Sequence, residues 1–456
     1  MKKSVFKVDM STGNIAKDAL LFSLPILFSG WLQLLYNAAD LIVCGQFGSK
    51  YSVGAIAATN SLTSLIVSLF LGFSVGANVL MATAFGARLK DKSTRIIGTT
   101  YALAIASGII LAVVGVTCSR YFLKAMGTPD EIIELSNTYM MIYFVGIPFT
   151  LIFNFGSALL RGMGETFKPF LFLAFAGAVN VSLNFLFVIT FHMDVAGVAT
   201  TTVIAQAISA ILVTISLLTS KSLFANLRIK SIRFHKDETI GIIRIGVPAG
   251  IQSALFSLSN VILQSSINSF GPDAVTGAGA ESSIESFMST GVDAFAQASV
   301  AFVGANYGAK NIQRVKKSIF IISLYGLIFT AIMATFAYFM AESLLRIYIQ
   351  DPVAISYGAE KLHLVSATYT VYALMSTISC AIRGFGYSIT PMIVSLMGIC
   401  VLRIVYIYTL FPLPELHSIF GLYISYPLSW AATLLAHLIC FFPLSKKAFA
   451  KIQPAE

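Results

Sequence analysis

Apolar runs of about 20 residues recur along the whole chain. A helix of that length crosses a hydrocarbon core of roughly 30 Å. The runs do not alternate apolar and polar residues, as the strands of a membrane β-barrel do. They therefore predict an all-α membrane protein with twelve transmembrane helices. We expect the spans at residues 19–45, 53–84, 96–119, 133–160, 169–191, 196–219, 239–268, 274–304, 316–340, 362–383, 388–411 and 419–444.

The composition excludes an ordinary soluble protein. Hydrophobic residues make up 57% of the chain and charged residues 11%, with a mean hydropathy of +0.83, whereas soluble domains carry roughly 25% charged residues. The sequence contains no Walker A motif and no His-Glu-x-x-His. Its five cysteines lack the spacing of a metal site. We therefore expect neither an enzyme nor a cofactor or metal site.

The distribution of Lys and Arg predicts the orientation. If both termini are cytoplasmic, most of these residues fall on the cytoplasmic side, as the positive-inside rule requires. Only Lys50, Arg120, Lys124, Arg346 and Lys361 then fall on the outer side. We predict a multi-pass protein of the cytoplasmic (inner) membrane. The net charge of +10 then reflects contact with anionic membrane lipids rather than nucleic acid.

The chain also repeats itself. The segment Arg-Gly-Met-Gly at 161–164 returns as Arg-Gly-Phe-Gly at 383–386. Each half contains six spans, so the halves have the same orientation and are expected to be parallel repeats. We predict two pseudo-symmetric six-helix lobes around a central cavity. The predicted boundaries are 1–220 for the N-terminal lobe, 221–238 for a cytoplasmic linker and 239–456 for the C-terminal lobe.

Two prolines occupy matched positions in the repeats. Pro25 and Pro248 lie early in the first span of each half. Inside a helix, proline removes a hydrogen bond and produces a kink. In the first turn it costs little. We favour a kink and leave the first-turn alternative open.

Asp40 is the first candidate for a functional ionisable group. It lies near the outer end of the first span, where an isolated carboxylate is costly unless it faces a cavity or a partner. Gln33, Tyr36 and Asn37 precede it by seven, four and three residues, so the four polar side chains share roughly one helix face. Lipid would penalise such a stripe.

The fifth span offers partners for Asp40. Asn180 and Asn184 are one helical turn apart and lie on one face. Asn154, Thr201 and Thr202 on neighbouring spans are candidates to join them. The alternative is a hydrogen-bonded polar cluster that only fixes helix packing.

The second half contains a separate set of charged residues. Glu281, Glu285 and Asp293 share the eighth span, and Arg403 lies deep in the eleventh. These residues predict either a second proton or cation site or an ion pair between Arg403 and one of the acids. The sequence leaves both alternatives open.

Four segments resemble the MATE (multidrug and toxic compound extrusion) family, most closely its DinF-like and MepA-like bacterial branches. They are residues 34–40 (Leu-Leu-Tyr-Asn-Ala-Ala-Asp), 45–48, 160–169 and 306–310. The resemblance implies a twelve-helix antiporter that exports organic, often cationic compounds against a proton or sodium gradient. It also implies that Asp40, Asn180 and the position of Asn184 form a polar cluster in the N-terminal lobe.

Two departures from the family pattern bear on the coupling ion. Asn184 stands where the family often has Asp, and residues 248–268 and 363–382 lack the acids of the sodium-coupled branch. We therefore expect a monomeric multidrug efflux antiporter that exchanges hydrophobic organic cations for protons by alternating access. Sodium coupling and a flippase for lipid-linked precursors stay as alternatives.

Overall fold

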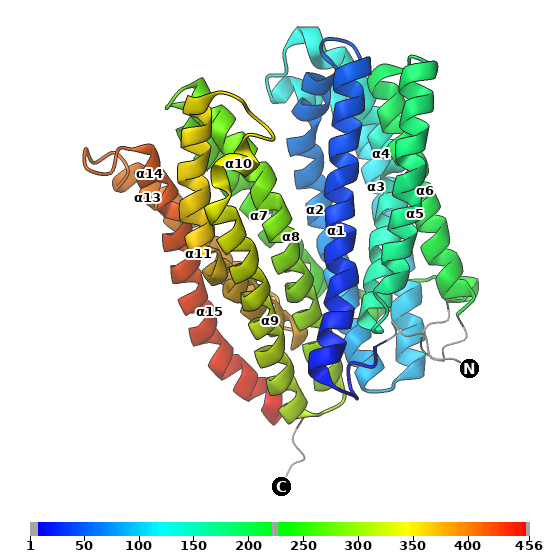
Figure 1. Ribbon diagram of the computed structural model, residues 1–456. Coiled ribbons are helices and arrows are strands. Elements are labelled where there is room, and N and C mark those ends of the chain that lie inside the picture. The colour runs from blue at the N-terminus through cyan, green and yellow to red at the C-terminus, as the bar shows by residue number, and fades with distance from the viewer. Residues whose placement is uncertain (1–7, 221–223, 225–226, 453–456) are drawn as a thin grey trace. The chain divides into compact units, whose positions relative to one another are not determined.

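The computed structural model describes residues 8–220, 224 and 227–452, which form helices joined by short connections (Figure 1). No strand occurs in these ranges. The first half contains α1 (Ile15–Phe47), α2 (Ser52–Gly86), α3 (Lys90–Ala125), α4 (Asp130–Gly162), α5 (Phe167–Asn184), a π-helix (Phe185–Thr190) and α6 (Asp194–Leu218). A 3-10 turn (Ile229–Ser231) precedes the second half. The second half contains α7 (Lys236–Asn268), α8 (Pro272–Gly308), α9 (Ile312–Phe339), α10 (Ala341–Leu345), α11 (Pro352–Gly384), α12 (Ile389–Ser395), a π-helix (Leu396–Val401), α13 (Leu402–Thr409), α14 (Ile419–Tyr423) and α15 (Ser425–Ala450).

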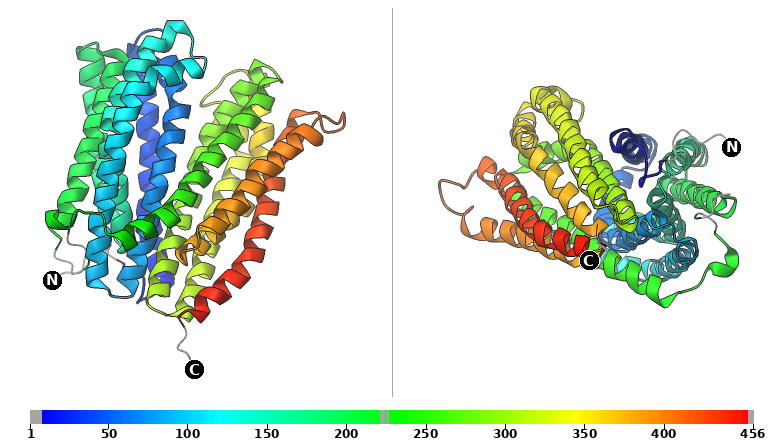
Figure 2. Two further views of the ribbon diagram at one scale, coloured as in Figure 1. Left: turned by 180° about the vertical axis from the view of Figure 1, so that it is seen from behind. Right: turned by 90° about the horizontal axis from the view of Figure 1, so that it is seen from below.

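The predicted all-α membrane fold is confirmed. Within the described ranges, eleven helices are long and apolar enough to cross a membrane, and α12, its π-helix and α13 count as one of them. That composite span runs alongside α15 (Figure 2). The twelfth expected span is α8, which has 37 residues but many serines, glycines and acids. Its polar content keeps it below the hydropathy of a lipid-facing helix and suggests contact with water or protein.

The compact units of the structure divide the chain at three places. Unit 1 contains Met1–Asp9 and Phe28–Gly250, and unit 2 contains Met10–Leu27 and Ile251–Glu456. Helix α1 therefore begins in unit 2 and α7 begins in unit 1. The lobe boundaries 1–220 and 239–456 stay a prediction. Each unit differs from the corresponding predicted lobe by one half-helix.

Both prolines lie close to the points where a helix changes unit. Pro25 is two residues before the end of the α1 segment in unit 2, and Pro248 is two residues before the end of the α7 segment in unit 1. Each is inside its helix, more than two turns after the helix start. The first-turn alternative is therefore wrong for both, because each helix begins further upstream than a first-turn proline allows.

Hydrogen bonds explain why α1 begins in unit 2. Arg314 of α9 donates from Nη1 to the carbonyl of Gly13 at 3.0 Å and from Nη2 to that of Thr12 at 2.9 Å. One turn further on, the ring of Phe22 meets that of Phe302 edge-on, with centroids 5.5 Å apart. Charge-assisted bonds and an aromatic pair thus attach this half-helix to α8 and α9.

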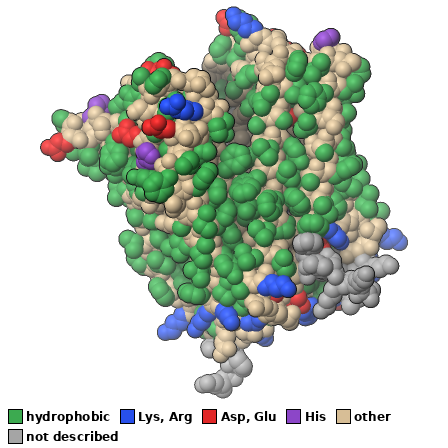
Figure 3. All heavy atoms as spheres, viewed as in Figure 1, with side chains coloured by type: hydrophobic (Ala, Val, Ile, Leu, Met, Phe, Trp, Pro, Cys, Tyr) green, Lys and Arg blue, Asp and Glu red, His purple; other side chains and the backbone are tan. Residues whose placement is uncertain are grey.

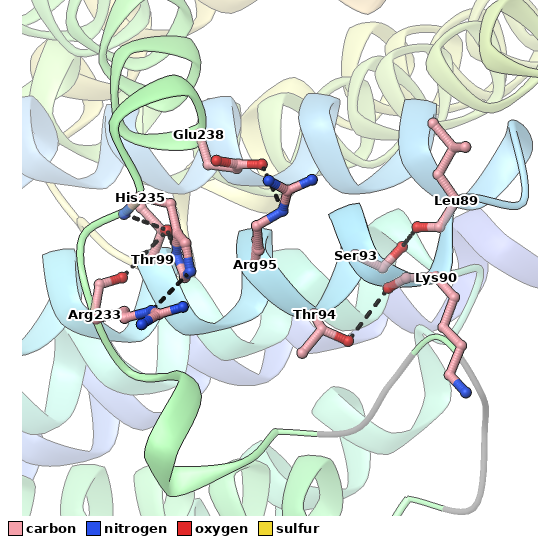
Figure 4. A network of polar contacts seen from close by, with 9 residues as sticks. All are labelled: Leu89, Lys90, Ser93, Thr94, Arg95, Thr99, Arg233, His235 and Glu238. Carbon is pink, nitrogen blue, oxygen red and sulfur yellow. Dashed lines mark hydrogen bonds and ion pairs between the residues drawn. The ribbon is translucent and has the colours of Figure 1, made fainter.

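Side chains of α3 attach the start of α7 to unit 1 (Figure 4). Arg95 Nε lies 3.4 Å from Glu238 Oε1, and Glu238 is buried. Thr99 Oγ1 lies 3.0 Å from His235 Nδ1, just before α7 begins. The ion pair and the hydrogen bond therefore attach both ends of the first turn of α7 to α3.

Glycines then let α7 cross α2 closely. A Cβ added to Gly72 would lie 2.3 Å from the backbone nitrogen of Gly250, and one added to Gly76 would lie 2.3 Å from the carbonyl oxygen of Ile242. Small residues allow membrane helices to pack backbone to backbone. This crossing explains why α7 stays in unit 1 as far as Gly250.

Each unit has its own apolar core. In unit 1, α4 packs against α2, α3 and α6 and buries Phe144 and Leu151. In unit 2, α11 packs against α8, α9 and α15 and buries Leu362, Val365 and Tyr369. Over unit 2, Figure 3 shows a hydrophobic middle and a row of Lys and Arg side chains at the end where α9 begins. That pattern agrees with the charge asymmetry of the sequence.

Candidate functional site

Asp40 lies on α1 in unit 1, half-buried, and accepts two hydrogen bonds from neutral side chains. Asn184 Nδ2 donates to Oδ1 at 2.5 Å, and Thr202 Oγ1 donates to Oδ2 at 3.2 Å. No basic side chain of the described residues lies within 4 Å of the carboxylate. The charge of Asp40 is therefore stabilised by dipoles alone.

The asparagines of α5 extend this network. Thr201 Oγ1 donates to Asn184 Oδ1 at 2.5 Å, and Asn184 Nδ2 lies 3.5 Å from Asn180 Oδ1. Asn180 Nδ2 in turn lies 3.5 Å from Thr202 Oγ1. Asn180, Asn184 and Thr201 are buried. We call Asp40, Asn180, Asn184, Thr201 and Thr202 the Asp40 cluster; the structure brings together all five, as the sequence predicts.

A π-helix follows the cluster directly. Asn184 is the last residue of α5, and the π-helix Phe185–Thr190 begins at the next residue. Such wide turns often occur at functional sites because they change the direction of the side chains around them. Sequence analysis did not predict this turn.

The other residues of the α1 stripe do not bond the carboxylate. Gln33 and Asn37 are exposed. Tyr36 donates to the carbonyl of Ala174 at 3.2 Å, and its ring covers Gly177, where an added Cβ would lie 1.9 Å from ring carbons. Two exposed amides on a membrane helix indicate a hydrated face.

Asn154 does not join the cluster. Its Nδ2 donates to the carbonyl of Thr150 on the same helix at 2.8 Å. A side chain that bonds its own helix in this way satisfies itself without a partner on another span. Asn154 is thus a polar residue of unit 1 outside the candidate site.

In unit 2, Glu281 forms an ion pair that sequence analysis missed. Its carboxylate contacts Lys361 Nζ, and the two side chains are 0% and 2% exposed. Lys361 Nζ also donates to Ser282 Oγ at 3.2 Å and lies 5.5 Å from the centroid of the Tyr426 ring. Lys361 therefore lies inside a helix that the predicted span 362–383 did not include, and Glu281 is paired with Lys361 rather than with Arg403.

The physical reason is the length of α11. This helix begins at Pro352, ten residues before the predicted start, so Lys361 lies within it and faces α8. The signal was present in the sequence. Asp351 caps the helix by accepting from the backbone nitrogens of Val353 and Ala354 at 2.8 and 3.0 Å, and Asp followed by Pro is typical of a helix start.

The remaining charged candidates of unit 2 have neutral hydrogen-bond partners or are exposed. Glu285 accepts from the hydroxyl of Tyr369 at 3.5 Å, and Asp293 is exposed on α8. Arg403 donates to Ser429 and Asn260, both neutral. Glu281, Glu285, Asp293 and Arg403 therefore share no hydrogen bond or ion pair with one another among the described residues, although Glu285 interacts electrostatically with Glu281 and Arg403. A second site formed by these residues stays a prediction. The described residues contain no group of three or more His, Cys, Asp or Glu side chains that could hold a metal ion.

Comparison with known proteins decides the family. The MatE family model matches residues 25–186 and again residues 248–409. The chain belongs to the MatE family. The two matches begin 223 residues apart, which agrees with the internal repeat and shows that each half carries one copy of the family's unit.

Relatives of this MatE protein cover most of its length. The probable multidrug resistance protein YpnP of Bacillus subtilis is 26% identical over 87% of this chain and 88% of its own. The probable multidrug resistance protein YoeA of the same organism is 24% identical over 93% of each. A solved MATE family transporter in an outward-facing conformation has a TM-score of 0.89 at 18% identity, covering 99% of both chains. That likeness confirms the two-lobe MATE fold.

Proposed function

We propose that this protein exports hydrophobic, mostly cationic organic compounds in exchange for protons, by alternating access across the cytoplasmic membrane. The names of its relatives as multidrug resistance proteins support export of drug-like molecules. The observation that carries the proton assignment is the Asp40 cluster, in which one carboxylate has only neutral partners. We also propose a monomer with both termini in the cytoplasm and in contact with membrane lipids.

The Asp40 cluster suits a carboxyl group that gains and loses a proton. The charged form accepts from Asn184 and Thr202. The protonated form has one O–H donor, and the hydroxyl of Thr202 can rotate to accept from it because a hydroxyl both donates and accepts. Either state thus keeps its polar atoms paired, which matters because an unpaired buried polar atom costs about 1–3 kcal/mol.

Exchange follows if proton and cargo favour different states of Asp40. The charged carboxylate attracts a cationic compound, and a proton removes that attraction. Each ligand then lowers the affinity for the other by the same factor, because the linkage is reciprocal. Gln33 and Asn37, exposed on the same helix, offer a polar surface along which water and cargo reach the carboxylate.

Sodium is the second coupling ion to test. Hard cations take oxygen ligands, and the cluster contains one carboxylate, two side-chain amides and two hydroxyls. In the structure Asn184 turns its NH2 group toward Asp40, while its oxygen accepts from Thr201. This orientation places a donor where a sodium ion would need an oxygen, and it favours a proton.

Dye efflux from proteoliposomes tests the proposal. A pH gradient and a sodium gradient are imposed separately, with a hydrophobic cationic dye such as ethidium as cargo. The wild-type protein and the control Asn154→Ala are expected to respond to the pH gradient alone, and Asp40→Asn to neither gradient. Full pH-driven efflux by Asp40→Asn contradicts the role of Asp40. Efflux driven by sodium alone contradicts proton coupling, and an immobile dye in wild type contradicts export.

A further inference from the structure

Arg403 is a buried cation whose hydrogen-bond partners carry no charge. It is the second residue of α13, directly after the π-helix Leu396–Val401, and only 3% of it is exposed. Its Nε donates to Ser429 Oγ at 2.9 Å, and its Nη1 donates to Asn260 Oδ1 at 3.4 Å. The guanidinium carbon lies 4.4 Å from the centroid of the Tyr426 ring.

No anion of the described residues balances this charge at contact distance. Glu281 is paired with Lys361. Glu285 interacts electrostatically with Arg403 without contacting it, and accepts from the hydroxyl of Tyr369. No carboxylate oxygen within the described ranges lies within 4.0 Å of Arg403. A guanidinium has five N–H donors, and its hydrogen bonds to described residues use only Nε and Nη1. A buried charge left in this state is costly, so the site favours an added anion.

Asn260 connects Arg403 to a hydrated helix face. Ser253, Ser257, Asn260 and Gln264 follow one another on α7 at spacings of four, three and four residues, which places them on one face. Each of the four is exposed or half-exposed. Lipid would penalise such a row, so the face contacts water. A water-borne ligand can therefore approach the guanidinium along α7.

Aromatic rings surround the other side of Arg403. The Tyr426 ring that contacts the guanidinium lies 5.7 Å from the ring of Trp430. Trp430 in turn lies 5.3 Å from Tyr372 and 5.6 Å from Tyr369, measured between centroids. Aromatic rings beside a guanidinium group suit a ligand that carries both an aromatic system and a planar carboxylate.

We propose that Arg403, with Asn260 and Ser429, binds the carboxylate group of aromatic organic molecules. Arginine suits this role because its planar fork matches a carboxylate in two parallel hydrogen bonds. The proposal does not depend on proton coupling at Asp40, since Arg403 and its partners all belong to unit 2.

A matched pair of dyes tests the site on the purified full-length protein. Rhodamine 110 carries a free carboxylate, and rhodamine 123 is its methyl ester, so the two differ only at the proposed contact. Fluorescence polarisation in phosphatidylcholine nanodiscs gives the ratio of their affinities. We expect Arg403→Gln to weaken binding of the acid by about tenfold, the size of one lost charge-assisted contact, and to leave the ester nearly unchanged.

Further variants keep the test decisive. Arg403→Lys retains the charge without the fork and is expected to give an intermediate ratio, which also serves if Arg403→Gln does not fold. Arg383→Gln, the same change at an arginine that bonds Gln252 in this unit, is the control and should keep the wild-type ratio. Asp40→Asn should also keep a ratio that favours the acid, even if it stops efflux.

Two results would overturn the proposal. One is an acid-to-ester ratio that stays the same in Arg403→Gln and Arg403→Lys. The other is loss of acid binding when phosphatidylglycerol replaces part of the phosphatidylcholine, with no effect of that lipid on Arg403→Gln. That second outcome would assign the guanidinium to a lipid phosphate instead of a cargo carboxylate.

Discussion

The two units stabilise their buried acids in opposite ways. Asp40 in unit 1 is half-buried and accepts only from Asn184 and Thr202. Glu281 in unit 2 is sealed from solvent and contacts the ammonium group of Lys361. Asp40 therefore has only neutral partners within hydrogen-bond distance, whereas Glu281 has a cation in direct contact. Two copies of one repeat thus contain one acid without a cation in contact and one acid in an ion pair.

The proposed function assigns coupling to unit 1, so Asp40→Asn is the change with the largest expected effect. An amide neither binds nor releases a proton near neutral pH. We therefore expect pH-driven dye efflux to fall at least tenfold, to the level of empty liposomes. A tenfold change corresponds to about 1.4 kcal/mol of free energy. Thermal unfolding of the variant should match or exceed that of wild type, because the amide mimics the neutral acid. If instead Glu281→Gln stops pH-driven efflux while Asp40→Asn does not, the assignment of the two acids is reversed.

Lys361→Met tests whether the ion pair of unit 2 fixes the charge of Glu281. Removing the ammonium leaves a buried carboxylate without its cation, a change that typically costs about 3–5 kcal/mol. The loss should be greater at alkaline than at acidic pH, because protonation of Glu281 removes the unpaired charge. This loss of stability is measured from the thermal unfolding midpoint of the detergent-solubilised protein between pH 5 and 9.

The double variant Glu281→Met with Lys361→Met is the control for this prediction. It removes both charges and should recover most of the stability, since replacing a buried pair by apolar side chains is often neutral. Additive losses in the double-mutant cycle would show that the two side chains do not act as a pair.

The contacts that attach the start of α1 to unit 2 and the start of α7 to unit 1 can be compared in the same way. Arg314→Ala removes the hydrogen bonds to Gly13 and Thr12 and one to Asn306 Oδ1 at 3.1 Å. Hydrogen bonds to a charged group contribute about 1.5–3 kcal/mol, so we expect a local loss of about 2 kcal/mol. Hydrogen exchange at the start of α1 should accelerate about 30-fold, while exchange in α4 stays unchanged.

The corresponding change in unit 1, Arg95→Ala, should have the smallest effect of all these changes. Arg95 is about half-exposed, and a pair with one exposed partner contributes about 0.2–1 kcal/mol. We expect Arg95→Ala to accelerate exchange at the start of α7 by about fivefold at most, because His235 and the glycine crossing with α2 remain. An effect as large as that of Arg314→Ala would show that the Arg95–Glu238 pair, not the glycines, holds this half-helix.

Much of the Asp40 cluster was predictable because each member is a polar residue in an apolar run. A membrane helix carries few such residues, and those it carries face a partner or water. Helical spacing placed Asn180 and Asn184 on one face, and the structure adds the hydrogen bonds among them. Asn154 fitted the same pattern and nevertheless bonds its own helix, because a carbonyl four residues earlier was close enough.

Lys361 shows why the predicted start of the span 362–383 was wrong. The apolar run begins after it, and hydropathy alone therefore excluded it from the membrane helix. Its helix begins earlier because Asp351 and Pro352 supply a start signal that hydropathy does not measure. Capping chemistry at the helix ends would have placed Lys361 inside the protein, although not against Glu281.

The sequence by itself determined the number, type and approximate length of the helices, the repeat and the candidate acid of the first half. These properties depend on local hydropathy and helical spacing, which neighbouring residues specify. Tertiary structure alone decided that Glu281 pairs with Lys361, that Arg403 has only neutral hydrogen-bond partners, and that α1 and α7 each begin in the other unit. Such pairings depend on contacts between helices far apart in the chain, where packing and desolvation select one partner among several of suitable charge.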